Sequence, residues 1–342
     1  MSGKNARRTG GRVLRKLGLR AAPEPRTPWV SAVDFASPEP LSELKLFAIL
    51  GAWMEEDVIA ATVANAFAQG CERVFLVDND SSDGTVREAV AAGAELAEVF
   101  RTEQYDEVLR LDIMNRVVRE QSELDGSEHI WWLWLDADEF PHGPRGLTVR
   151  EFLEPLDRRY RIVGARFINH YPDRVPASAP GRHPLDFQPL CEEHRLGCAL
   201  KHRKHSLQRY DRGGVPILSD RGFHRATSEE RPLLEPVEAI YLHHFPYREE
   251  DVTRRRLALL CGTDEHGNTR VQEGDDAADG MVPRFQTLDA VYRGDWANVR
   301  NYRPDGEFAV ANPIEWSQLA RPEDLAVRRW YPDAQTSHPR NP

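Results

Sequence analysis

The chain has 342 residues, of which 40% are hydrophobic and 29% are charged, and its formal net charge is −10. These values are typical of a globular protein that is long enough to bury one large α/β core. No apolar run reaches the roughly 18–20 residues that a membrane-spanning helix needs. The acidic balance argues against a general nucleic-acid-binding protein.

The first 20 residues are basic, with seven Lys or Arg and no acid, and subtracting these seven charges from −10 leaves −17 for the rest. We interpret residues 1–44 as a Pro-rich, partly disordered leader, with peripheral contact to an anionic membrane surface as the alternative. The leader lacks the apolar segment of a secretion signal, and the four cysteines form no CxxC pair. We therefore expect a cytoplasmic protein, either free or held at the inner face of the membrane.

Strands and helices alternate through the first part of the chain. Hydrophobic periodicity predicts strands over 45–53, 73–77, 97–101 and 129–135, and helices over 58–69, 85–92 and 106–121. This alternation predicts an α/β fold with a doubly wound, mostly parallel sheet and helices on both faces. We assign this pattern to a first half over 45–145.

The pattern changes after residue 145. It predicts helices over 147–156 and 249–261, strands over 161–168 and 239–244, irregular active-site loops over 170–225 and a mobile loop over 263–280. We expect a second half over 146–330 and a frayed C-terminal tail over 331–342.

The strongest candidate for chemistry is the segment WWLWLDADEFP, in which an apolar strand ends at Asp136, Asp138 and Glu139. Ligand sites of parallel sheets lie beyond the carboxyl ends of the strands. Acids gathered there are costly unless a cation neutralises them, and Mg²⁺ or Mn²⁺ that also binds phosphate oxygens suits this position. The alternative is a polar turn in which Asp138 caps the next segment.

A second acidic segment, DNDSSDGT, starts at Asp78 directly after the second predicted strand. Asp78, Asp80 and Asp83 offer acceptors for the base and ribose of a nucleotide. An EF-hand loop is excluded, because its sixth and twelfth positions would be Asp83 and Ala89 instead of Gly and Glu. The alternative is an Asx turn that caps the following helix through Asp83 or Thr85.

Histidines form the third candidate group. The doublet His243-His244 follows a predicted strand, and three arginines at 254–256 come soon after it. Neutral imidazole binds Mn²⁺ and arginine binds diphosphate, although a structural role is the alternative. The segment 191–205 contains two Cys and three His, but its spacings match no structural zinc pattern and favour a basic loop near phosphates.

The order of strand, DNDSSDGT, helix, strand and DADEF resembles the glycosyltransferase family 2-like group, over roughly residues 45–260. More narrowly, it resembles the bacterial branch with a DxDEF signature, which is similar to family 92. This resemblance implies a GT-A fold, with a Rossmann-like, nucleotide-sugar-binding half over 45–145 and a variable acceptor-side half over 146–330.

The resemblance also implies site residues. As ligands of Mn²⁺ or Mg²⁺ it implies Asp136, Asp138 and either His224 or His244. For the nucleotide-sugar donor it implies contacts from Glu55, Asp78, Asp80, Asp83, Asp136, Lys204 and Arg248. Candidates for the catalytic base are Glu139, near the metal in sequence, and three acids of the presumed acceptor region, Asp173, Glu192 and Glu193.

The activity implied by the resemblance is metal-dependent transfer of a sugar from a UDP- or GDP-sugar to a hydroxyl group, with inversion, in cell-surface polysaccharide synthesis. The acceptor is a glycan, a lipid-linked molecule or a protein. Two alternatives stay open: a nucleotidyltransferase of similar architecture, and a non-catalytic nucleotide-sugar-binding or scaffold domain. A nucleotidyltransferase usually has a Gly-rich phosphate loop with a basic residue near the first strand, which AILGAWMEED lacks.

Overall fold

The computed structural model describes residues 37–102, 106–172, 184–186, 188–193, 204–220, 223, 225–229, 233–261, 288–295, 300–301, 308–309 and 314–315. Its contacts divide the chain into two units, Met1–Ser37 and Pro38–Pro342. The fold belongs to the second unit. Residues 1–36 of the predicted leader, the predicted mobile loop and the predicted tail lie outside the described residues.

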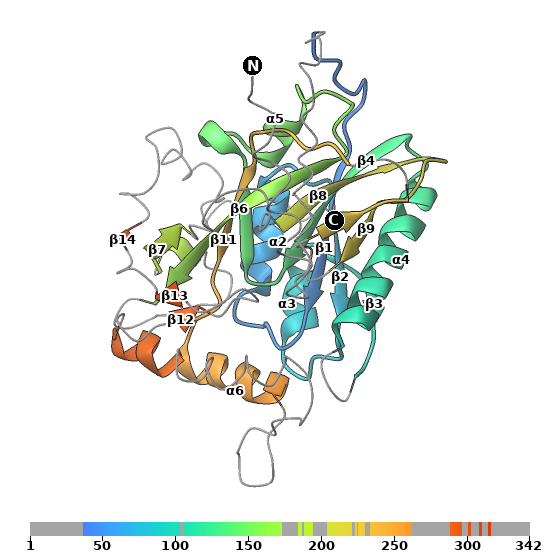
Figure 1. The fold of residues 1–342 in the computed structure, drawn as a ribbon. Coiled ribbons are helices and arrows are strands. Elements are labelled where there is room, and N and C mark those ends of the chain that lie inside the picture. The colour runs from blue at the N-terminus through green and yellow to red at the C-terminus, as the bar shows by residue number, and fades with distance from the viewer. Residues whose placement is uncertain are drawn as a thin grey trace, which may run out of the picture. The chain divides into compact units, whose positions relative to one another are not determined.

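Four parallel strands form the first part of the main sheet (Figure 1). They are β1 (Leu46–Ala52), β2 (Arg73–Asp78), β3 (Glu95–Val99) and β4 (His129–Asp136), in the spatial order β3-β2-β1-β4. Every residue of β1 is buried, because a parallel strand covered on both faces is apolar throughout rather than alternating. The predicted α/β fold with its parallel core is confirmed.

The second half of the chain extends the same sheet with antiparallel strands. Beyond β4 follow β8 (Lys204–Asp211), β6 (Ile162–Tyr171), β7 (Leu190–Glu193) and β14 (Ile314–Glu315). β11 (Ile240–His244) runs parallel to β6 and antiparallel to β5 (Glu139–His142). Two separate pairs are β9 (Leu218–Asp220) with β10 (Arg225–Thr227), and β12 (Arg300–Asn301) with β13 (Phe308–Ala309).

Helices cover both faces of the parallel strands, as predicted. The labelled α-helices are α2 (Ile59–Ala68), α3 (Thr85–Ala91), α4 (Glu107–Asp125), α5 (Val149–Leu153) and α6 (Glu250–Cys261). Residues 288–293 are also helical, and two 3₁₀ turns span Pro144–Gly146 and Pro184–Asp186. One hydrophobic cluster joins Leu46 and Leu50 of β1 to α2, α3 and α5, and a second joins Phe47 and Ile49 to α4. None of the described helices combines the length and apolarity needed to cross a membrane.

Caps set the ends of α4. The side chain of Asp106 accepts a hydrogen bond from the backbone N of Leu109 at 2.9 Å, and Gly126 ends the helix with φ +80°. A left-handed glycine is a common helix terminator. The helix therefore runs four residues beyond its predicted end at 121.

The prediction of irregular loops over 170–225 is wrong for residues 204–211, which form the central strand β8. Its sequence KHSLQRYD has polar residues at buried positions, so no apolar pattern marks it. Hydrogen-bond partners make this burial tolerable: Lys204 bonds to two acids far away in the sequence, and Gln208 bonds to the hydroxyl of Ser219. Tertiary contacts rather than local pattern thus determine this strand.

Candidate active site

The strands bring the predicted acidic segments to one edge of the sheet. In the β1–β2 register Ala52 pairs with Asp78, and in the β1–β4 register Gly51 pairs with Asp136. His244, at the end of β11, pairs with Glu139 of β5. The carboxyl ends of β1, β2 and β4 therefore converge with the histidine doublet, as ligand sites of open α/β sheets require.

Asp136 is held by two cations. Arg110 of α4 donates from Nη1 to Oδ1 at 2.8 Å, and Lys204 of β8 donates from Nζ to Oδ2 at 2.9 Å. Lys204 also donates to Glu139, whose other oxygen accepts the backbone N–H of Asp136 at 3.0 Å. Because Lys204 is 2% exposed and Glu139 1%, we call Arg110, Asp136, Glu139 and Lys204 the buried clamp.

The clamp separates the titration of its two acids. Burial alone would raise the pKa of Asp136, but the charges of Lys204 and Arg110 hold that pKa well below its usual range. Burial raises the pKa of Glu139 against the opposing charge of Lys204. Both oxygens of Glu139 are bonded inside the clamp. This side chain therefore supports Lys204 and Asp136 and does not face a hydroxyl group from which it could take a proton.

Asp138 belongs to a different network. Its Oδ2 lies 3.5 Å from Nη1 of Arg248 and 3.7 Å from Nε2 of His244. Arg248, itself buried, also pairs with Glu55 and donates from Nε to Asp57 at 2.6 Å. Arg256 of α6 also belongs to this network, because it pairs with Glu55 and lies 4.0 Å from Asp138.

This second network holds more carboxyl groups than guanidinium groups. Three carboxylates (Glu55, Asp57 and Asp138) face two guanidinium groups (Arg248 and Arg256). Burial raises the pKa of Glu55 to about 7. For Asp57, burial acts in the same direction, but Arg248 outweighs it and lowers the pKa. The Asp136–Asp138 pair predicted as one unit is thus divided between a clamp and an acidic network.

His244 lies beside Asp138. Its Nδ1 lies 2.9 Å from Oδ1 of Asn169, and because an amide oxygen only accepts, the proton is on Nδ1. Burial lowers the pKa of His244, which favours the neutral ring, and Nε2 lies 3.7 Å from Oδ2 of Asp138. A carboxylate oxygen and an imidazole nitrogen this close together are groups that a divalent cation can take as ligands.

The residues present fit a divalent ion that keeps phosphate and water ligands. One carboxylate and one neutral imidazole supply two ligands, and Mg²⁺ typically takes only one or two protein carboxylates beside substrate phosphates. Among the described residues no third His, Cys, Asp or Glu completes a cluster. His224, the other predicted ligand, lies outside the described residues.

The loop after β2 folds as a turn. Asp78 is buried and accepts from the backbone N of Ser81 at 2.8 Å and from its hydroxyl at 2.6 Å, and burial raises its pKa. Asp83 accepts from the backbone N of Thr85 at 2.9 Å, as in an Asx turn ahead of α3, whose N-cap is Gly84 without a side-chain capping bond. Asp80, with φ +50°, is half exposed and lies 3.6 Å from Arg101.

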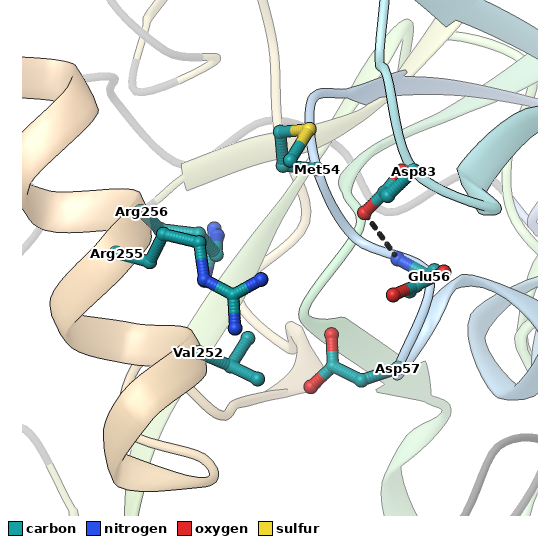
Figure 2. A pocket seen from close by; sticks show the side chains of 7 residues that line it. All are labelled: Met54, Glu56, Asp57, Asp83, Val252, Arg255 and Arg256. Carbon is teal, nitrogen blue, oxygen red and sulfur yellow. Dashed lines mark hydrogen bonds between the residues drawn. The ribbon is translucent and has the colours of Figure 1, made fainter.

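Figure 2 shows a small pocket between the loop after β1 and α6. Acids on the loop side face arginines on the helix side, and its lining consists of Met54, Glu56, Asp57, Asp83, Val252, Arg255 and Arg256. Its volume of about 60 Å³ holds a few waters. Carboxylates accept hydrogen bonds from hydroxyl groups, and arginines bind phosphates. The pocket therefore suits a ligand that carries both hydroxyl and phosphate groups.

Buried histidines form a chain behind the doublet. Nε2 of His142 lies 2.9 Å from Nε2 of His243, whose Nδ1 lies 2.7 Å from Nε2 of His170. The outer nitrogens face backbone oxygens of Gly143 at 2.7 Å and Gln188 at 2.9 Å. His243 is therefore a structural residue, unlike its neighbour His244.

Acid should destabilise the protein through this chain. Burial lowers the pKa of both His142 and His170 to about 3 in the folded state, whereas the unfolded value is about 6.5. The unfolded chain thus binds more protons than the folded one between pH 6.5 and 3. As the pH is lowered through this range, the free energy of unfolding decreases by up to about 1.4 kcal/mol per pH unit for each histidine. Urea titrations should show a shallower acid slope for His142→Gln than for wild type; equal slopes would contradict this.

Several functional positions had no signal in the sequence. Arg110 stands within an ordinary amphipathic helix, and Asn169 within a strand. Gly51 in β1 leaves room for Arg110, because a Cβ there would lie 2.9 Å from Nη1 of this arginine, which would have to shift. Phe223 has φ +64°, which costs a bulky residue about 1–2 kcal/mol. For the cysteine–histidine segment, Cys191 is buried in β7 and residues 194–203 lie outside the described residues.

The side chains of Glu192 and Glu193 lie outside the description, as does Asp173. Their strand is nevertheless placed: in the β6–β7 register Glu192 pairs with Asn169, the residue that binds His244.

No family model matches the chain, and no curated protein does. Among solved structures the chain is similar to glucosyl-3-phosphoglycerate synthase from Mycobacterium tuberculosis, solved with Mn²⁺, UDP and glucosyl-3-phosphoglycerate, at 15% identity and a TM-score of 0.25, over 36% of this chain and 44% of that one. It is also similar to mannosyl-3-phosphoglycerate synthase from Rubrobacter xylanophilus, at 22% identity and a TM-score of 0.25, over 36% of this chain and 40% of that one. The chain thus spans less than half the length of each of these proteins.

Proposed function

We propose that the protein is a metal-dependent glycosyltransferase of GT-A type that moves a sugar from a nucleoside-diphosphate sugar to a hydroxyl acceptor. The observation that carries this proposal is the pair of facing acceptors, Oδ2 of Asp138 and Nε2 of His244, 3.7 Å apart in a network with more acids than arginines. The pair stands at the carboxyl edge of the parallel strands, where such enzymes bind their donor. We place the activity in the cytoplasm, in cell-surface polysaccharide synthesis.

In this proposal Asp138 and His244 hold Mn²⁺ or Mg²⁺, with His224 as a further ligand. The ion would supply electrostatic stabilisation of the nucleoside diphosphate that leaves. Arg248 holds Asp138 in place at 3.5 Å, and Arg256, on the pocket wall, contacts the diphosphate.

Asp136 is proposed to accept hydrogen bonds from the donor. The clamp fixes its orientation and ionisation, because Arg110 and Lys204 bond to separate oxygens. Binding to a carboxylate that is already oriented costs less than ordering it on arrival. Further donor contacts are proposed for the loop acids Asp78, Asp80 and Asp83 and for Glu55.

For deprotonation of the acceptor we propose Glu192 or Glu193 rather than Glu139, because Glu139 is bonded on both oxygens. Inverting transfer needs one base within reach of the attacking hydroxyl. Strand β7 stands one strand from β11 across β6.

Ligand-induced thermal shifts test the proposal. With Mn²⁺ present, UDP or GDP and their sugars at about 100 times Kd should add about 2.7 kcal/mol of stability, and the shift should vanish with a chelator. A shift with nucleoside triphosphates alone would instead favour a nucleotidyltransferase. No shift with any nucleotide would favour the scaffold alternative and overturn the proposal.

A further inference from the structure

Phe223 lies beneath the buried clamp. Its ring is fully buried, and its centroid is 5.1 Å from the guanidinium carbon of Arg110 and 4.8 Å from Nζ of Lys204. The ring of Trp134 packs on it at 5.4 Å. The two cations that contact this ring are the same two that bind Asp136.

The backbone holds this ring in place. The carbonyl of Phe223 accepts a hydrogen bond from the backbone N of His205 at 2.8 Å, which ties residue 223 to β8 beside Lys204. The φ of +64° is a conformation that aromatic residues rarely adopt. Strained residues that persist are typical of functional sites, and here the ring contacts are what the strained backbone secures.

We propose that Phe223 is a positioning residue that aligns Arg110 and Lys204 on the two oxygens of Asp136. The negative face of an aromatic ring attracts cations, and a ring that touches both lets two like charges approach one carboxylate. Gly51 leaves the space into which Arg110 fits. The consequence for donor binding rests on the proposed function, whereas the alignment itself does not.

A double-mutant cycle tests the alignment without any ligand. Phe223→Leu, Arg110→Met and the double variant are compared with wild type by urea denaturation. If the ring holds Arg110, the double variant loses clearly less stability than the sum of the single losses, because both changes remove one interaction. Strictly additive losses would overturn the inference.

Donor affinity tests the consequence. We expect Phe223→Leu to weaken binding of Mn²⁺ with UDP or GDP about tenfold, and Phe223→Tyr to restore most of it because the ring is kept. Phe152→Leu, which removes the same atoms from the buried helix α5 away from the clamp, is the matched control and should destabilise the fold without weakening binding.

Wild-type affinity for Phe223→Leu would overturn the positioning role. If wild type itself binds neither nucleotide, the proposed function fails, and the cycle still decides whether the ring aligns the clamp.

Discussion

Replacing Asp138 by Asn is expected to reduce sugar transfer by roughly 10²–10³-fold. The amide keeps the shape of the side chain but removes the charge that faces Nε2 of His244. The fold should persist, because Arg248 keeps its pairs with Glu55 and Asp57. Transfer and donor hydrolysis are measured at saturating Mn²⁺, together with the Mn²⁺ concentration for half-maximal rate.

Asp112→Asn is the control for this experiment, because Asp112 is an exposed acid on α4. It should leave both rates unchanged. Unchanged transfer by Asp138→Asn itself would remove the carboxylate from the metal site and with it the main support for the proposed chemistry.

The second large effect is expected for the free energy of unfolding, when Lys204 is replaced. Lys204→Met should cost about 3–5 kcal/mol of unfolding free energy, because breaking a buried ion pair leaves charges without compensation. Asp136 would keep only Arg110, and Glu139 would lose its one cation. Urea denaturation of the variant measures the loss.

Lys45→Met gives the matched control. Lys45 pairs with Asp125 at 2.9 Å but is a quarter exposed, so this change should cost less than about 1 kcal/mol. Adding Glu139→Gln to Lys204→Met should recover part of the loss, since it removes a buried carboxyl group that has lost its cation. Equal losses for the two lysine variants would show that the clamp contributes nothing beyond a surface pair.

The parallel half of the fold could be predicted because its signal is local. Strands β1, β2 and β4 are apolar runs, and polar residues after each run mark its end. The convergence of Asp78 and Asp136 then follows from parallel topology alone. The strand β8 could not be predicted, since it has no apolar pattern and the acids that make Lys204 tolerable in a core come from distant parts of the chain.

For the candidate site, the sequence indicates residue types but not their arrangement. Asp136 and Asp138 were expected to share one cation, whereas the chain supplies Arg110 and Lys204 for the first and leaves the second facing His244. Spacing of two in sequence says nothing about the direction of each side chain in a turn. Asn169 decides which nitrogen of His244 carries the proton, and only the pairing of β6 with β11 brings the two together.

The histidine chain ties three strands together. Its four contacts run from Gly143 through His142, His243 and His170 to Gln188, and the three rings stand on β5, β11 and β6. Both end carbonyls only accept, so the outer rings donate outward through Nδ1. The two outer strands are thus coupled through the central ring, and His244 of the candidate site follows that ring directly in the chain.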